Sequence, residues 1–199
     1  MWNFFDKIYC INLDRRTDRW KASIDEFSRV GLFAERFSAT EQDNHCLAFN
    51  DSQWRCLKSF VESEKEKGLV LEDDCSFKNL SHLYEAFAEL PENWDVIYLG
   101  ANLNGQKLER YSSHLFRIRN AFTTHAVGYS RKMAKFIVEN FKPNEFPIYD
   151  EWLRIHVQEQ FNCFVVAPMV AWQRPDTSDI WGHYADYTNC FQEGDKLLV

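Results

Sequence analysis

Apolar positions along the chain follow two patterns that alternate. Continuous apolar runs predict buried strands. The clearest runs span residues 7–13, 69–71, 95–100 and 161–166, and weaker ones span 33–37, 115–119 and 126–129. Apolar residues that recur every three or four positions predict helices. These cover residues 20–30, 54–61, 80–90, 133–141 and a segment that starts near Asp150. Strands that alternate with helices are typical of an α/β domain with a mixed, mostly parallel sheet flanked by helices.

Capping residues and helix breakers set the ends of these elements. Thr17 is placed to cap the first helix and Gly31 to end it, and prolines follow two later helices. From Gln173 onward the pattern shows no clear period, and neither a linker nor a repeat divides the chain. We therefore expect one domain over residues 1–199, with a core at about 7–181 and a C-terminal tail at 182–199.

The composition bears mainly on which molecules the protein can bind. Of the 199 residues, 45% are hydrophobic and 27% are charged, which is an ordinary globular mixture. The 23 basic and 30 acidic side chains give a formal charge of −7. This balance disfavours a nucleic acid as partner, because a duplex needs its phosphates neutralised. A small anion can still be held by local arginines or by a metal.

Targeting and redox signals are weak. The N-terminal segment lacks the basic start of a signal peptide. The longest run without charge or amide, 163–172, is shorter than the ~20 residues of a membrane span. The 6 cysteines show no C-x-x-C spacing, so we expect reduced thiols. We expect a cytoplasmic protein without a transmembrane segment, and a peripheral association with a membrane stays open.

The most informative residues are three adjacent carboxylates, Glu72, Asp73 and Asp74, which follow the apolar run 69–71 directly. Alternation along an extended segment sends Glu72 and Asp74 to one side and Asp73 to the other. Ligands of open α/β sheets bind at the carboxyl edge of the strands, and paired carboxylates there suit Mn²⁺ or Mg²⁺. The alternative is a solvated acidic turn.

A second polar cluster follows the first predicted strand. It holds Asn12, Asp14, Arg15, Arg16 and Arg19 at a strand-to-helix turn. Guanidinium groups and the free N–H groups of a helix start both suit phosphate. The alternative is that these arginines pair with neighbouring aspartates on the surface.

These segments occur in an order that resembles family 25 of the glycosyltransferases, which includes lipooligosaccharide and procollagen galactosyltransferases. The matching segments are 8–20 (IYCINLDRRTDRW), 69–74 (LVLEDD), 95–100 (DVIYLG), 126–134 (AVGYSRKMA), 147–150 (PIYD) and 167–180. The resemblance covers residues 7 to about 181. The chain departs from the family at Gln53, where a histidine is usual, and at 127–129, where the expected aromatic residue is shifted or replaced.

The resemblance implies a single GT-A-like nucleotide-sugar-binding domain. It also implies a UDP-sugar donor, most often UDP-galactose, a saccharide or glycoconjugate acceptor, and inversion at the anomeric carbon. Mn²⁺ or Mg²⁺ would be held by Glu72 and Asp74, with His183 as a third ligand. The donor would contact Asn12, Asp14, Arg15, Arg16, Arg19, Asp73 and Gly100.

An inverting displacement also needs a general base for the acceptor hydroxyl. Asp150 and Glu151 are the candidates, and we favour Asp150, which starts a predicted helix. A carboxylate there can equally stabilise the helix dipole. His125 and Trp181 are candidate sugar contacts, although an internal histidine and a core tryptophan are the plainer interpretations.

Two other functions compete with this prediction. A metal-dependent phosphoesterase would use the same carboxylates, but two-metal hydrolases need more carboxylate and histidine clusters than this chain carries. A catalytically inactive family member would serve as a nucleotide-sugar-binding or protein-interaction module. Gln53 keeps that second possibility open.

Overall fold

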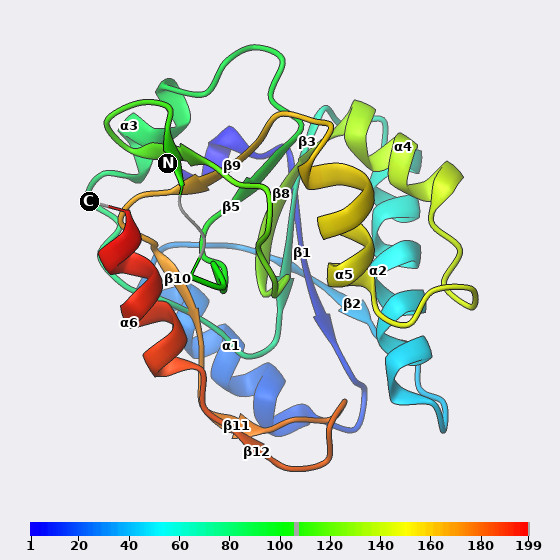
Figure 1. Cartoon of the computed structure of the whole chain (residues 1–199). Helices are drawn as coiled ribbons and strands as arrows, with labels where there is room; N and C mark the ends of the chain where they lie inside the picture. The colour runs from blue at the N-terminus through cyan, green and yellow to red at the C-terminus, as the bar shows by residue number, and fades with distance from the viewer. Residues whose placement is uncertain (106–107, 199) are drawn as a thin grey trace.

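An eight-stranded sheet runs through the middle of the computed structural model, which describes residues 1–105 and 108–198 (Figure 1). Its strand order is β2-β1-β3-β8-β5-β9-β7-β6. The strands are β1 (Lys7–Asn12), β2 (Glu35–Ser38), β3 (Lys67–Glu72), β5 (Val96–Tyr98), β6 (Glu109–Arg110), β7 (Leu115–Arg117), β8 (Ala126–Ser130) and β9 (Cys163–Val166). Strands β7 and β8 run against the other six. The predicted mixed, mostly parallel sheet is therefore confirmed.

Helices cover both faces of this sheet. They are α1 (Thr17–Arg29), α2 (His45–Glu62), α3 (Leu83–Ala88), α4 (Arg131–Asn140), α5 (Tyr149–Leu153), which continues into a π-helical turn (Arg154–Gln158), and α6 (Thr188–Leu197). Helices α2, α4 and α5 pack on one face, and α1 and α3 lie on the other (Figure 1). Two short antiparallel sheets of two strands each complete the fold: β4 (Cys75–Phe77) with β10 (Ala171–Gln173), which are remote in sequence, and β11 (Asp176–Thr177) with β12 (Tyr184–Ala185).

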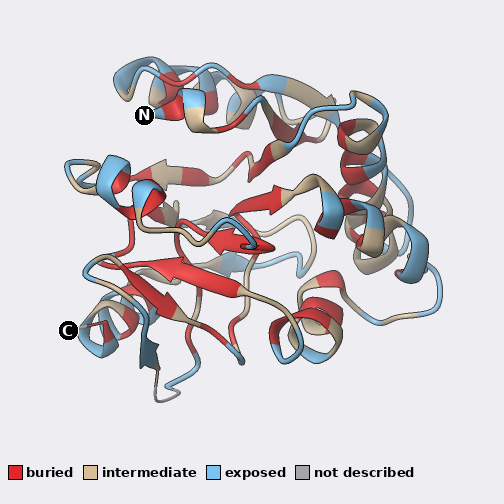
Figure 2. Ribbon diagram, turned by 90° about the horizontal axis from the view of Figure 1, so that it is seen from above, coloured by how far each residue is buried: buried red, intermediate tan, exposed pale blue. Residues whose placement is uncertain are grey.

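Burial on both faces explains why the central strands are continuous apolar runs in the sequence. Along β3, Val70 joins the core beneath α2 and α4, whereas Leu69 and Leu71 join the opposite core. Figure 2 shows the buried residues concentrated in the strands and on the inner sides of the helices. A strand with two apolar faces must lie inside a sheet that helices cover on both sides. The functional groups are therefore confined to the strand ends.

Three local expectations need correction. Arg16, not Thr17, precedes α1, and its side chain makes no capping bond; Gly31 does follow the helix with φ +65°, as expected. Helix α2 begins at His45, well before residue 54, and the Asn44 side chain accepts the Leu47 N–H. The sequence pattern does not reveal the early turns of α2, because their apolar residues form one block at 46–49 and a polar run at 50–53 interrupts the helical spacing. The tail contains α6, which the sequence does not reveal because the helix buries only Phe191 and Gly194.

Within the described ranges 1–105 and 108–198, no helix combines the length and the apolar character needed to cross a bilayer.

Gly100 is a packing residue at the crossing of two chain segments. A Cβ atom at this position would lie 1.7 Å from the Ala171 carbonyl oxygen and 3.1 Å from His125 Nε2. The Ala171 N–H is itself hydrogen-bonded to the Leu99 carbonyl at 3.0 Å, so the backbone of β10 cannot move away cheaply. We infer that position 100 requires glycine because the backbone of β10 packs directly against it.

We predict that Gly100→Ala lowers the free energy of unfolding by about 3 kcal/mol or more, because backbone atoms must separate. Gly31→Ala is the matched control: its Cβ would meet nothing within 4 Å, and only the positive φ is strained. That control should lose ~1 kcal/mol. Urea unfolding of both variants measures the difference, and equal losses would contradict the packing requirement.

Candidate functional site

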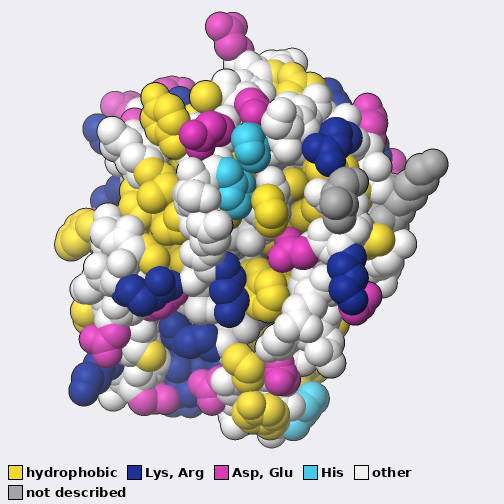
Figure 3. All heavy atoms as spheres, turned by 90° about the vertical axis from the view of Figure 1, so that its left-hand side faces the viewer, with side chains coloured by type: hydrophobic (Ala, Val, Ile, Leu, Met, Phe, Trp, Pro, Cys, Tyr) yellow, Lys and Arg dark blue, Asp and Glu magenta, His cyan; other side chains and the backbone are white. Residues whose placement is uncertain are grey.

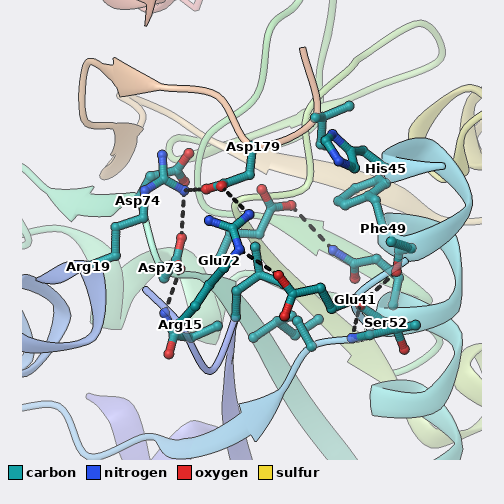
Figure 4. A pocket seen from close by; sticks show the side chains of 18 of the residues that line it. Arg15, Arg19, Glu41, His45, Phe49, Ser52, Glu72, Asp73, Asp74 and Asp179 are labelled. Carbon is teal, nitrogen blue, oxygen red and sulfur yellow. Dashed lines mark hydrogen bonds and ion pairs between the residues drawn. The ribbon is translucent and has the colours of Figure 1, made fainter. Parts of the chain in front are cut away.

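A pocket of about 130 Å³ opens where β1 and β3 end (Figure 4). Its walls come from the ends of these two parallel strands, the turn before α1, the segment 39–42, the first turns of α2 and the loop between β11 and β12. The carboxyl ends of parallel strands meet at one edge of a sheet, which is where open α/β sheets bind ligands. The sequence places its two polar clusters at this same edge.

All three carboxylates of the acidic triplet line this pocket. The predicted division, with Asp73 on the opposite side, is wrong because β3 ends at Glu72 and the chain then turns toward β4. Glu72 Oε1 accepts hydrogen bonds from Thr124 Oγ1 at 2.7 Å and from Gln53 Nε2 at 3.3 Å. Asp74 Oδ2 accepts one from Gln173 Nε2 at 3.3 Å.

Burial and mutual repulsion disfavour the charged forms of these carboxylates. Burial, followed by the charge of Asp74, raises the pKa of Glu72 to about 8. Burial also raises the pKa of Asp73 and that of Asp74, although the Arg19 guanidinium opposes both shifts. A nearby cation would remove this repulsion.

The donor atoms around Asp74 fit a hard divalent cation. Asp74 Oδ1 is buried and has no hydrogen-bond partner among the described residues, and the neighbouring Gln173 Oε1 shares this condition. Carboxylate and amide oxygens are ligands that Mg²⁺ and Mn²⁺ accept. Among residues 1–105 and 108–198, no group of three or more His, Cys, Asp or Glu side chains is gathered for a metal. A cation here would take two carboxylates and complete its shell with other oxygens.

Asn12 and Asp73 hold each other at the base of the pocket. The Asn12 Nδ2 donates to Asp73 Oδ2 at 2.7 Å and to the Arg16 carbonyl at 3.1 Å. Its Oδ1 accepts from Arg36 Nε at 2.8 Å. Both side chains are buried. Asn12 thus joins the end of β1 to the acidic triplet through bonds within the protein.

The arginines near the pocket are paired with carboxylates, several of them from the far end of the sequence. Arg15 contacts Glu41 at 2.5 Å and Asp179 at 2.7 Å. Arg19 contacts Asp73 at 2.8 Å and Asp176 at 2.9 Å. Arg16 contacts Asp18, Asp176 and Asp179. Figure 4 shows Arg15 and Arg19 pointing toward Asp179 and Asp73 at the pocket. Of the local pairs that the alternative interpretation proposed for these arginines, the described residues show Arg16 with Asp18.

Asp150 is near enough to Glu72 to affect its charge but does not line the pocket, and Glu151 is paired elsewhere. The charge of Asp150 contributes to the raised pKa of Glu72, and burial raises the pKa of Asp150 itself. Its Oδ2 accepts the Thr123 N–H at 3.3 Å. Glu151 instead pairs with Arg154 at 2.5 Å, and this bond lowers the pKa of Glu151.

The other candidate residues do not line this pocket. Asp14 is exposed and pairs with Arg36. His183 and Trp181 are exposed between β11 and β12, and the His183 ring contacts the Trp181 carbonyl at 3.1 Å. His125 is buried against Phe191, where burial lowers its pKa to about 4. Gly100 packs on β10.

Thr123, Thr124 and Gln53 are site residues that the sequence does not identify. Thr123 has φ +72°, an unfavourable conformation for a β-branched residue. In this conformation one short segment binds two acids: the Thr123 N–H donates to Asp150, and the Thr124 hydroxyl donates to Glu72. The sequence singled out Gln53 only as a departure from the histidine that is usual in the family, and not as a partner of Glu72.

We predict that Glu72→Gln stabilises the protein by ~1–2 kcal/mol above pH 8. The folded-state pKa is raised from 4.5 to about 8, so Glu72 weakens the fold increasingly as pH rises between these values. The gain in Tm should therefore be greatest above pH 8 and disappear near pH 4.5. Glu62→Gln, at the exposed end of α2, is the control and should show no such dependence. A pH-independent gain for Glu72→Gln would contradict the electrostatic origin.

Comparison with known proteins gives matches in structure alone. No family model matches the chain, and no curated protein matches its sequence. The chain is similar to the crystal structure of A197 from STIV, with 13% sequence identity, 85% of each chain covered and a TM-score of 0.55. At this identity the match supports the fold and says nothing about activity.

Other structural neighbours are transferases with lower scores. A glycosyltransferase involved in glycosylation of the major capsid of PBCV-1 has 14% identity, 80% of each chain covered and a TM-score of 0.49. A Drosophila β-1,4-galactosyltransferase 7 mutant, in complex with manganese, UDP-Gal and xylobiose, has 12% identity and a TM-score of 0.42, with 94% of this chain and 72% of that one covered. Membership of glycosyltransferase family 25 in particular has no support from these matches. The structure has a mixed α/β fold whose structural neighbours include glycosyltransferases.

Proposed function

We propose that this protein is a metal-assisted glycosyltransferase. It would move a hexose, with galactose as the first choice, from a UDP-sugar to a hydroxyl group of a saccharide or glycoconjugate, with inversion. One observation carries this proposal: Glu72 and Asp74 line one pocket at the carboxyl edge of the sheet, the charge of Asp74 disfavours that of Glu72, and Asp74 Oδ1 is buried without a hydrogen-bond partner among the described residues.

The charges that line the pocket explain why a nucleotide would need a cation. Five acidic side chains line it: Glu41, Glu72, Asp73, Asp74 and Asp179. Arg15 and Arg19 are the arginines on the same lining, and both are already paired with carboxylates. A diphosphate brought to this surface alone would be repelled. A bound divalent cation would reverse the sign of the local charge and attract the diphosphate.

Glu72 and Asp74 would hold the cation, with Mn²⁺ preferred over Mg²⁺. When bound, such an ion supplies Lewis-acid stabilisation to the departing diphosphate. Thr124 and Gln53 keep the Glu72 carboxylate in place through its Oε1. Arg15, half-exposed at the mouth of the pocket, is the arginine best placed to meet a phosphate. Arg16 and Arg19 are more deeply enclosed and support the surrounding walls.

Asp150 would serve as the general base. As the acceptor oxygen forms its bond to the anomeric carbon, the bond from that carbon to the UDP oxygen breaks, and the acceptor proton passes to an Asp150 oxygen. Its raised pKa brings it closer to the working pH, which favours proton transfer. Glu151 is held by Arg154 and is the weaker candidate.

We predict that Mn²⁺ and UDP bind cooperatively and that Asp74→Asn abolishes the effect. A ligand at a hundred times its Kd adds ~2.7 kcal/mol of stability, which thermal unfolding detects readily. UDP and a panel of UDP-sugars would be titrated with Mn²⁺ or EDTA, and the exposed Asp25→Asn variant on α1 is the charge-matched control. If neither UDP nor any UDP-sugar raises the Tm of the wild type, the proposal is wrong. Mn²⁺-dependent binding without sugar transfer would instead favour the nucleotide-sugar-binding module.

We also predict that Mn²⁺ affinity rises with pH up to about 8. A carboxylate must be deprotonated to bind a metal, and the raised pKa of Glu72 keeps its proton in place at neutral pH. Each pH unit below 8 should weaken binding up to about tenfold. Calorimetric titration between pH 6 and 9 in two buffers would count the proton released. A pH-independent affinity would exclude Glu72 as a ligand.

A further inference from the structure

The segment between Gln173 and Phe191 crosses the mouth of the pocket, and its Tyr187, just before α6, packs against the core. This segment, residues 174–190, is called the strap here. It contains β11 and β12, which pair only with each other in the described sheets. None of its residues is buried, whereas Ala171 before it and Phe191 after it are fully buried. Apolar packing therefore fixes the two ends of the strap, and the part between them depends on polar contacts.

Ion pairs to the turn before α1 hold the middle of the strap in place. Asp176 Oδ2 contacts Arg16 at 3.0 Å and Arg19 at 2.9 Å. Asp179 contacts Arg15 at 2.7 Å through one oxygen and Arg16 through the other. In the space-filling view, basic side chains gather among acidic ones on the lower part of one face, at the height of α1 and β11–β12 in Figure 1 (Figure 3). The Arg15–Asp179 pair is the most exposed of these and is the one that salt screens most readily, whereas Arg16 and Arg19 are more enclosed.

The strap separates two cavities that both reach Asp74. Asp179 and Ile180 line the 130 Å³ pocket on one side. They also line a second cavity of about 80 Å³ on the other side, which Arg19 and Asp74 border as well. Each of the two cavities is smaller than the roughly 300–1,000 Å³ of pockets that enclose drug-sized ligands. Moving residues 178–180 outward would join the two cavities around Asp74.

We propose that the strap is a gate, latched by Asp176 and Asp179 on Arg15, Arg16 and Arg19, that opens to admit an anionic nucleotide. Carboxylates and phosphates offer guanidinium groups the same paired oxygens. An incoming diphosphate thus competes with the strap for the same arginines and favours the open form. The identity of the ligand rests on the proposed function, whereas the latch itself does not.

Hydrogen exchange measured by mass spectrometry tests the latch without any ligand. Amides of residues 176–185 should exchange at least about fivefold faster in 500 mM than in 20 mM NaCl, while those of β3 stay unchanged. Asp179→Asn should produce a similar increase at low salt. The control is Asp186→Asn, which removes a charge from the same strap but whose side chain accepts the Thr188 N–H and contacts no arginine among the described residues. Strap amides that are as protected as β3 and insensitive to salt and to Asp179→Asn would overturn the latch.

Stopped-flow binding of a fluorescent UDP analogue with Mn²⁺ tests the gating. If opening limits entry, Asp179→Asn should raise the association rate at least about threefold, and Asp186→Asn should match the wild type. Equal association rates for all three proteins would overturn the gate. A wild type that binds no nucleotide would count against the proposed function, and the exchange experiment would still decide whether the latch exists. The salt titration uses the unaltered protein, so a variant that misfolds cannot obscure the result.

Discussion

Repulsion among carboxylates at the end of β3 is the constraint on which the rest of the site depends. Three acids emerge there from an apolar strand into a poorly solvated place, and each needs a different partner. Asp73 receives Arg19 and Asn12, and Glu72 receives Thr124 and Gln53. Asp74 keeps one oxygen without a hydrogen-bond partner among the described residues. The protein thus gives two of the acids internal partners and leaves one oxygen of the third acid for a ligand.

The sheet imposes this geometry because its strands are buried on both faces. Polar groups cannot lie along β1 or β3, so they collect where these strands end. The same edge receives the early turns of α2 and the loop that follows β11. Elements that are remote in sequence supply the partners of the acids.

The parts of this structure that are local in sequence could be predicted, and the parts that join distant segments could not. Strands β1 and β3 follow from their apolar runs, and the meeting of Asn12 with the acidic triplet follows from parallel strand ends. Pairing of Arg16 with Asp176 and Asp179 has no local signature. Helix α6 was missed because its pattern has too few apolar positions, and Thr123 because a strained backbone follows from its surroundings rather than its residue type.

The arginine–aspartate pairs also determine when the site can form. Arg15 and Arg16 lie 163 to 164 residues before Asp179. During synthesis the chain emerges from its N-terminus and folds progressively, so the guanidinium groups are made long before their partners. Contacts of such long range are also slow to close. The wall of the site would therefore be completed last, when the rest of the sheet can already be in place.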